Sequence, residues 1–361
     1  MDMGLMRVLV VNAGSSSLKL RVLDDDDTVV AEHDEQRWDG GTGVLTEFLG
    51  TAPAVDAVGH RVVHGGSVYT GPVVVDDGVR AGIEALGDLA PLHQPRAVAG
   101  IDAVSALLPG VAQVACFDTA FHADLPDAAS TYALPEAWRE RWGLRRYGFH
   151  GLSHAYAARR ATALAGLAPD LARVVTCHLG AGASLAAILG GRSVDTTMGF
   201  TPLAGLVMAT RSGDVDPGLL LWLLRELPPD HLADGLEHHS GLAGLSGHAD
   251  LRDVRTAADD RSALALRVYL HRLRQSIAGM AAAMGGTDLL VFTGGIGEHD
   301  CALRADTAEG LAFLGIAVDP RRNSATTADA RVSPDGAPVG VWVVTAREDK
   351  EIAAQTRAVL G

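Results

Sequence analysis

Two arginines, Arg61 and Arg211, lie in glycine-rich blocks rather than on regular helical faces. The blocks read VGHRVVHGG at 58–66 and ATRSGDVDPG at 209–218. A planar, permanently charged guanidinium fits phosphate and carboxylate oxygens in a bidentate way. An isolated arginine, however, more often forms a surface ion pair. The two blocks therefore indicate anion chemistry only in combination with other polar residues.

Asp118 and His150 are the next candidates. Asp118 follows the apolar run VAQVACF at 111–117, which places a carboxylate at the C-terminal edge of a predicted strand, where open α/β sheets bind ligands. Its alternative role is a turn or cap residue. His150 and His154 have the spacing HxxxH, but the glutamate of HExxH is missing, so the spacing does not favour zinc. A single histidine of this kind is more often structural.

Glycine-rich turns recur along the chain. VLVVNAGSSSLKLRVL at 8–23 and VVTCHLGAGASLAAIL at 174–189 each enter and leave on strand-like runs, which predicts two similar hairpins whose backbone N–H groups face a phosphate-bearing ligand. A third turn, LLVFTGGIGEHD at 289–300, predicts a strand, a glycine turn and a helix that begins near Glu298. The only lysines, Lys19 and Lys350, exclude a GxxxxGK[ST] loop.

The elements that must position these residues alternate between strands and helices, as in α/β proteins. We expect strands at 6–12, 17–23, 57–63, 112–117, 173–178, 184–189, 288–293 and 339–345. We expect helices at 94–108, 153–166, 216–226, 260–284 and 347–359. The acidic run at 24–27 predicts a solvated hairpin turn rather than a metal site.

Composition narrows the class of protein. A chain of 361 residues with 48% hydrophobic and 20% charged residues predicts a soluble protein of two domains. A net charge of −14 without a basic stretch argues against nucleic acid. Three widely spaced cysteines, Cys116, Cys177 and Cys301, indicate neither a disulfide framework nor a CxxC site and favour the cytoplasm. No run approaches 18 apolar residues and no secretory leader is evident, so neither membrane nor export is expected.

In combination, these blocks resemble the acetate kinase family across nearly the whole chain. The resemblance rests, in the family's order, on NAGSSSLK at 12–19, GHRVVHGG at 59–66, FDTAFH at 117–122, RYGFHG at 146–151, TRSGDVDPG at 210–218 and FTGGIGE at 292–298. It implies two related α/β domains of the actin-like fold, shared with sugar kinases and heat-shock ATPases, with nucleotide in an interdomain cleft. We place the domains at 1–122 plus 349–361 and at 123–348.

The resemblance also implies roles for matching residues. The catalytic set would be Asn12, Arg61, Asp118, His150 and Arg211, and the acyl group would meet Arg61, Val63, Leu92, Phe149 and Pro202. Mg²⁺, replaceable by Mn²⁺, would bind Asn12 and Glu348, with Asp349 as the alternative to Glu348. The ATP or ADP site would comprise Ser15, Ser17, Lys19, His178, Leu179, Gly180, Ala181, Gly182, Asp250, Leu251, Arg252, Gly295, Ile296, Gly297, Glu298 and His299.

The implied reaction is direct in-line transfer of a phosphoryl group from ATP to acetate, giving acetyl phosphate and ADP. A carboxylate with a pKa near 4 needs no strong base, whereas the transition state needs cations. Asp118 is therefore expected to orient an arginine or the waters of Mg²⁺ rather than to take a proton. Val63 predicts a tight acyl pocket that makes propionate the poorer substrate. Another acyl kinase of the same family, or a non-catalytic nucleotide-binding protein, is the alternative.

Two departures from the family pattern affect the nucleotide site. Ala181 stands where the family has the asparagine of HLGNG, and His299 where it has that of GIGEN. We expect altered nucleotide contacts but retained activity. The resemblance also implies a homodimer.

Overall fold

The chain divides into two compact units. The computed structural model describes residues 6–14, 17–91, 93–327 and 329–361. The first unit comprises Met1–Ala123, Phe149–Tyr156 and Arg347–Gly361, and the second comprises Asp124–Gly148 and Ala157–Ala346. Phe149–Tyr156 belongs with the first unit because the Gly151 N–H donates to the Asp118 carbonyl at 2.9 Å and Leu152 packs in that unit's core.

The sheet of the first unit has the order β3-β2-β1-β4-β6-β5. Strands β1 to β3 form an antiparallel meander, β4 and β6 run parallel to β1, and β5 is antiparallel to β6. Their bounds are β1 Val8–Ala13, β2 Leu18–Leu23, β3 Val29–Glu35, β4 Ala57–Val62, β5 Val73–Val74 and β6 Ala112–Phe117. The carboxyl ends of β1, β4 and β6 therefore lie at one edge of the sheet.

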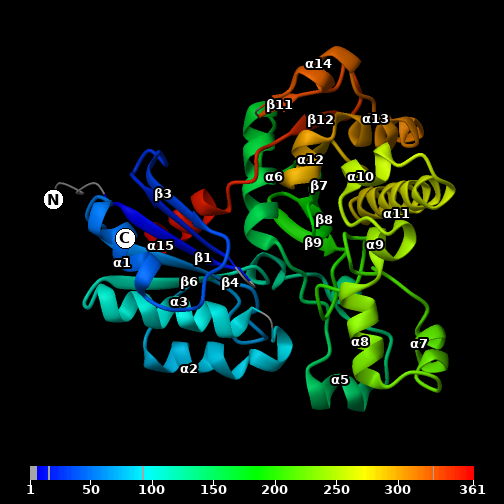
Figure 1. Ribbon diagram of the computed structural model, residues 1–361. Coiled ribbons are helices and arrows are strands. Elements are labelled where there is room, and N and C mark those ends of the chain that lie inside the picture. Colours follow the sequence, from blue (N-terminus) through cyan, green and yellow to red (C-terminus); the bar gives the residue numbers. More distant parts are fainter. Residues whose placement is uncertain (1–5, 15–16, 92, 328) are drawn as a thin grey trace. The chain divides into compact units, whose positions relative to one another are not determined.

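Both faces of this sheet are covered, and β1 shows why. Leu9 and Val11 lie in a core cluster with Ala103 and Val104 of α3, while Val8 and Val10 pack with Ile352 and Ala353 of α15. A strand buried on both faces reads as a continuous apolar run, as VLVV does here. Figure 1 shows these elements in blue, cyan and red. The helices are α1 Gly43–Thr51, α2 Asp77–Ala85, α3 Gln94–Leu107 and α15 Glu348–Leu360, with 3₁₀ turns at Gly87–Leu89 and Ala120–His122.

The second unit repeats the same sheet. Its order, read from β9, is β9-β8-β7-β10-β12-β11. It again has an antiparallel meander, two strands parallel to the first and an antiparallel edge strand. The strands are β7 Arg173–Leu179, β8 Ala183–Leu189, β9 Arg192–Thr196, β10 Leu289–Thr293, β11 Ala330–Arg331 and β12 Gly340–Val343. This repetition confirms the prediction of two related α/β domains.

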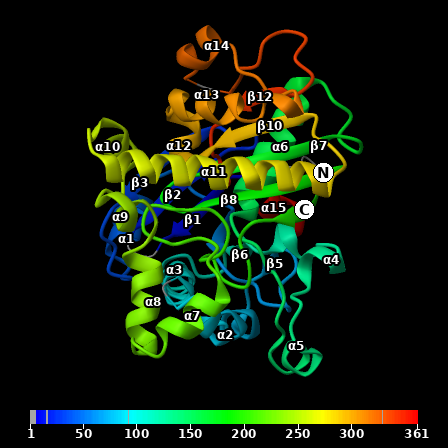
Figure 2. The ribbon, with the colours of Figure 1, turned by 90° about the vertical axis from the view of Figure 1, so that its right-hand side faces the viewer.

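Helices make up most of the rest of the second unit. The 24-residue α11 packs against β7, β8 and β9, and Figure 2 shows it across the sheet in yellow. The helices are α4 Asp127–Ser130, α5 Glu136–Trp142, α6 Gly151–Ala165, α7 Pro217–Leu223, α8 Pro229–His238, α9 Gly241–Ser246, α10 Leu251–Thr256, α11 Asp260–Ala283, α12 Gly294–His299, α13 Cys301–Glu309 and α14 Pro320–Ala325, with a 3₁₀ turn at Ala312–Leu314. Helix α6 begins in the first unit, to which its residues up to Tyr156 belong, and continues in the second. Within the described ranges, no helix has both the length and the apolar character needed to cross a membrane.

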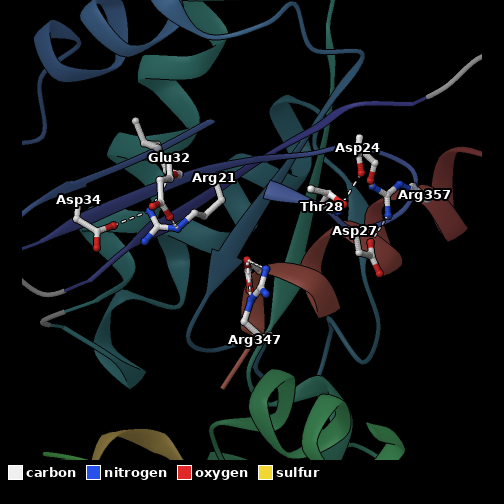
Figure 3. Close-up of polar contacts among 10 residues, drawn as sticks. Arg21, Asp24, Asp27, Thr28, Glu32, Asp34, Arg347 and Arg357 are labelled. Atoms are coloured by element: carbon white, nitrogen blue, oxygen red, sulfur yellow. Dashed lines mark hydrogen bonds and ion pairs between the residues drawn. The ribbon is translucent and has the colours of Figure 1, made fainter. Parts of the chain in front are cut away.

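The acidic run at 24–27 forms the turn between β2 and β3, which confirms the predicted hairpin. The Asp24 carboxylate accepts from the backbone N–H groups of Asp26 and Thr28. Arg357 of α15 pairs with Asp27 at 2.7 Å and donates to the Asp24 carbonyl at 2.6 Å (Figure 3). One arginine thus attaches this turn to the C-terminal helix.

Candidate active site

Arg61 and Asp118 form a bidentate ion pair at the carboxyl edge of the first sheet. Arg61 is the penultimate residue of β4, and Asp118 directly follows β6. The Arg61 Nη2 atom lies 2.6 Å from Asp118 Oδ2, and Nε lies 3.2 and 3.3 Å from the two carboxylate oxygens. Two adjacent parallel strands therefore deliver the cation and the anion to the same place.

Asn12 and Glu348 complete this cluster. Asn12 lies near the end of β1, and Glu348 is the first residue of α15. The Arg61 Nη1 atom donates to Asn12 Oδ1 at 3.3 Å, and Asn12 Nδ2 donates to Glu348 Oε2 at 3.4 Å. Arg61 Nη1 also lies 3.6 Å from Glu348 Oε2. The alternative, Asp349, instead pairs with Arg347 at 2.7 Å.

The electrostatics keep Arg61 charged. Burial works to lower the pKa of Arg61, but Asp118 and Glu348 outweigh it, and the pKa is raised. Burial raises the pKa of Asp118, and the adjacent Arg61 opposes that shift. The Asp118 side chain is 1% exposed and that of Arg61 is 18% exposed, so the guanidinium is the member of the pair that reaches solvent. The site therefore presents a cation whose orientation a buried carboxylate fixes.

His150 lies in strained backbone next to this cluster. Its φ is 56°, in the left-handed region that a residue with a side chain rarely adopts. The following residue must be glycine, because a Cβ at Gly151 would lie 2.2 Å from the Asp118 carbonyl oxygen. His154, by contrast, is fully buried and its ring packs 5.8 Å from that of His122. Among the described residues, no group of three or more His, Cys, Asp and Glu could hold a metal.

The turn of NAGSSSLK is tight where the structure describes it. The Gly14 N–H donates to the Ser17 carbonyl at 2.8 Å, and Ser15 lies outside the described residues. Lys19 of β2 is exposed and lies opposite Asn12 in the register of β1 and β2. Directly opposed residues share one face of an antiparallel pair. Lys19 and Asn12 therefore lie on the same face at this edge of the sheet.

Four of the five residues expected at the acyl group belong to the first unit: Arg61, already described, Val63, Leu92 and Phe149. Val63 follows β4 and is partly buried, and Phe149 is 1% exposed. The His64 ring packs edge-on against Phe149, with 5.4 Å between the ring centroids. Leu92, the third of these residues, lies outside the described residues.

Apart from Ser15, Ser17 and Lys19, the residues predicted to bind the nucleotide belong to the second unit. His178 and Leu179 end β7, and Gly180, Ala181 and Gly182 form the turn into β8, where the Gly180 N–H donates to the Gly182 carbonyl at 3.0 Å. The Ala181 carbonyl accepts from Ala209 N–H at 3.1 Å. Leu179 is fully buried, so its side chain belongs to the core of this unit.

The third glycine turn is helical from its first residue, so the prediction that its helix begins near Glu298 is wrong. Helix α12 begins at Gly294, whose φ of 79° and position above Leu179 leave no space for a Cβ. The helix starts early because Glu298 Oε1 accepts from the Gly294 N–H at 2.9 Å, and the same oxygen accepts from the Ala346 N–H. This helix carries Gly295, Ile296, Gly297 and His299, with His299 exposed.

Helix α10 carries the remaining predicted nucleotide segment. Asp250 is its N-cap, Leu251 is buried, and the Arg252 side chain is 86% exposed and pairs with Asp250. On the same helix, Arg255 donates to Asp300 at 3.1 Å and to Asp306 at 2.9 Å. Arg255 thereby joins α10 to the junction of α12 and α13.

Arg211 and Pro202 are brought together in the second unit. The Arg211 Nη1 atom donates to the Pro202 carbonyl at 3.2 Å and contacts the Met208 sulfur at 3.7 Å. Burial lowers the pKa of Arg211, and Glu237 opposes the shift. Its partners are neutral, so its charge is available to an anion.

Three residues that support segments of the site could not be predicted from the sequence: Gln94, Arg255 and Arg304. Arg304 is 1% exposed and donates to the carbonyls of Gly297, Glu298 and Asn323, so it holds the end of α12. No local motif marks these residues, because their partners lie in other segments of the chain. Arg255, for example, is 51 residues from Asp306.

The repeated sheet and the arginine–carboxylate cluster at the edge of the first sheet define a two-domain α/β protein with a charged site. The model of the Acetokinase family matches residues 44–354, and the chain belongs to this family, whose members are kinases with a carboxyl group as acceptor.

Acetate kinases of other organisms are similar to this chain over nearly its whole length. It is 44% identical to the acetate kinase of Clavibacter sepedonicus over 98% of this chain and 99% of that one, and 40% identical to that of Dictyoglomus turgidum over 99% and 98%. The crystal structure of Porphyromonas gingivalis acetate kinase is similar with a TM-score of 0.91 at 36% identity, covering 99% of this chain and 100% of that one. That of a Francisella tularensis propionate kinase has a TM-score of 0.89 at 31% identity, covering 98% and 100%.

Proposed function

We propose that this protein is an acetate kinase that transfers the γ-phosphoryl group of ATP reversibly to acetate by direct in-line attack. The observation that carries the proposal is the Arg61–Asp118 pair beside Asn12 and Glu348, in a chain of the Acetokinase family. A buried carboxylate that orients a partly exposed guanidinium suits the binding of an anion better than proton transfer.

The chemistry then follows from charge. Acetate is ionised at neutral pH and attacks without a general base. The barrier lies in the approach of two anions and in the charge on the equatorial oxygens of the transition state. Arg61 and Arg211 would supply fixed positive charge, and His150 a hydrogen bond to the transferring group. Asp118 would hold the Arg61 fork in place and would not take up a proton.

The donor set of Asn12 and Glu348 fits Mg²⁺. One carboxylate and one amide are hard oxygen ligands, and Mg²⁺ is usually held by few protein groups together with water and substrate phosphates. When bound, Mg²⁺, or Mn²⁺ in its place, would neutralise charge on the phosphates. Lys19, on the same face as Asn12, would meet the phosphates, with Ser15 and Ser17 in the preceding turn.

The nucleotide would contact the turn of His178 to Gly182, Asp250 to Arg252, and Gly295 to His299. Ala181 offers only backbone groups, and His299 Nδ1 donates to the Gly295 carbonyl at 2.9 Å. Exposed Arg252 suits a phosphate or ribose contact. The acyl group would meet Val63, Leu92, Phe149 and Pro202, which favours acetate over propionate.

The deciding experiment is detection of acetyl phosphate, trapped with hydroxylamine, from ATP, Mg²⁺ and acetate. The same assay is repeated with propionate and butyrate. Acetate is expected to have the highest kcat/KM, with propionate lower by about tenfold, because one methylene is worth about 1–3 kcal/mol. A higher value for propionate would instead favour the activity named for the Francisella relative. No hydroxamate from any carboxylate would rule out a kinase.

We also propose a homodimer that works in the cytoplasm. Buried, free Cys116 and Cys177 are compatible with a reducing compartment. Short helix α7 and the residues beside it expose large apolar side chains, among them Leu221 at 67% and Trp222 at 53%. Exposed apolar side chains of this size suit a subunit interface. Light scattering of the chain and of a Leu221→Asp variant tests this, and a monomeric parent chain would contradict it.

A further inference from the structure

Gln94 is a fully buried polar side chain that the proposed mechanism does not use. It is the first residue of α3 and is 0% exposed. Its Oε1 atom accepts from the His64 N–H at 3.3 Å, and its Nε2 atom donates to the carbonyls of His64 at 2.9 Å and Ile83 at 3.3 Å. One amide therefore satisfies both backbone groups of His64, as a neighbouring strand would.

His64 lies between two of the proposed acyl-binding residues of the first unit. It follows Val63 directly in the chain, and its ring packs edge-on against Phe149. The ring is also held from its own loop, because His64 Nδ1 accepts from the Gly66 N–H at 2.8 Å. A shift of the His64 backbone would therefore move Val63 and the ring that supports Phe149 together.

Val63 depends on the residues on either side of it for its position. On one side, the Val62 carbonyl accepts from the Asp118 N–H at 2.9 Å, which continues the pairing of β4 and β6. On the other side, His64 no longer lies in the strand, and Gln94 binds its backbone. Protein interiors are packed so closely that a change of one methylene in volume affects them. The hydrogen bonds that fix the His64 backbone therefore matter for the shape of a site for a small ligand.

We propose that Gln94 is a positioning residue for acyl-chain specificity, which acts by fixing the backbone of His64 and with it Val63 and Phe149. This inference rests on the proposed function, because it takes Val63 and Phe149 as the residues that meet the acyl group. Gln94 itself is buried and need not touch the substrate.

The test is Gln94→Met, which keeps the volume of the side chain and removes its three hydrogen bonds. The ratio of kcat/KM for propionate to that for acetate is measured in the parent chain and the variant. We expect the ratio to rise about tenfold, which is at the lower end of the discrimination that one methylene gives, about 10–200-fold. Gln94→Asn, whose amide is one methylene too short to reach both groups of His64, should give a smaller rise and serves if the methionine variant does not fold.

Two further variants separate the possible failures. Gln113→Met removes another buried amide of the same unit, which contacts His60 and Ser105, and should leave the ratio unchanged. Val63→Ala enlarges the proposed acyl site directly and should raise the ratio. An increase for Val63→Ala without one for the Gln94 variants would overturn the role of Gln94 and leave the proposed function standing. No increase for Val63→Ala would overturn the acyl site itself, and an equal increase for Gln113→Met would reduce the effect to general loosening.

Discussion

In the proposed mechanism Arg61 has both a stabilising and a chemical role, and the two can be separated by experiment. Arg61→Ala should lower kcat by about 10²–10³, the usual cost of removing one donor to a transition state. It should also lower Tm, since a buried Asp118 without its partner costs about 3–5 kcal/mol. Adding Asp118→Asn should restore much of the Tm but none of the kcat. Thermal unfolding by circular dichroism and the hydroxamate assay measure the two effects.

Arg80→Ala is the matched control, because that arginine forms a bidentate pair with Asp102 on an exposed surface. It should change neither quantity appreciably. If the double variant recovered kcat together with Tm, Arg61 would be a structural residue only.

Arg211 should behave differently from Arg61. Its partners are the Pro202 carbonyl and the Met208 sulfur, so Arg211→Ala leaves no buried charge unpaired. We expect a loss of kcat of similar size, about 10²–10³, with little change in Tm. Arg322→Ala, which breaks an exposed ion pair with Asp335, controls for the loss of an arginine in the same unit. Unchanged kcat in Arg211→Ala would remove this residue from the mechanism.

At the scale of elements, Arg255 links the two helices that carry predicted nucleotide residues. Its guanidinium joins α10 to Asp300 and Asp306, and Asp300 caps α13 through the Leu303 N–H at 2.7 Å. Arg255→Ala should therefore raise KM for ATP about fivefold, or roughly 1 kcal/mol for a partly exposed pair. KM for acetate and kcat should change little.

Arg173→Ala is the control for Arg255. Arg173 pairs with Asp288 at the N-terminal ends of β7 and β10, whereas the predicted nucleotide residues follow the C-terminal ends of these strands. Initial rates at varied ATP and at varied acetate distinguish the two variants. Equal increases in both Michaelis constants would mean that Arg255 supports the fold in general and not the nucleotide site.

The sequence predicted the buried elements well and the exposed ones poorly. All eight expected strands and all five expected helices are present, because each carries an apolar run, alternating apolar residues or a helical apolar face. It missed β3, whose residues VVAEHDE are largely exposed and which gains its order by pairing with β2. The early start of α12 depends on the hydrogen bond that the Gly294 N–H donates to the Glu298 carboxylate, which no local propensity encodes.

The candidate site likewise has contacts that the sequence predicts and contacts that only the fold shows. Strand ends placed Arg61 and Asp118 at one edge of the sheet, so their proximity followed from topology. The contact of Asn12 with Glu348 spans 336 residues, and only the folded chain shows that Glu348 contacts Asn12 while Asp349 pairs with Arg347. The hydrogen bonds of Gln94 and Arg304 likewise depend on tertiary packing, which spacing along the sequence does not reveal.

At the scale of the whole molecule, the two units should differ in their response to acid. Burial lowers the pKa of His60, His64 and His122 to about 4 in each case, and all three lie in the first unit. Each would regain an ordinary pKa near 6.5 on unfolding. Their contribution to stability is therefore complete above pH 6.5 and is lost as the pH falls from 6.5 to about 4, by roughly 1.4 kcal/mol per pH unit for each proton.

A spectroscopic signal can isolate the first unit, because it contains only one of the five tryptophans, the buried Trp38. The difference in fluorescence between the chain and Trp38→Phe then reports the unfolding of that unit alone in urea, whether or not the two units unfold together. We expect the midpoint from this signal to fall steeply between pH 6.5 and 5. His60→Gln has no proton to titrate but can still bind Gln113. This variant should reduce the slope of the fall by the contribution of one proton. His231→Gln, at an exposed position, should not. A midpoint independent of pH in this range would mean that these histidines titrate alike in the folded and unfolded chain.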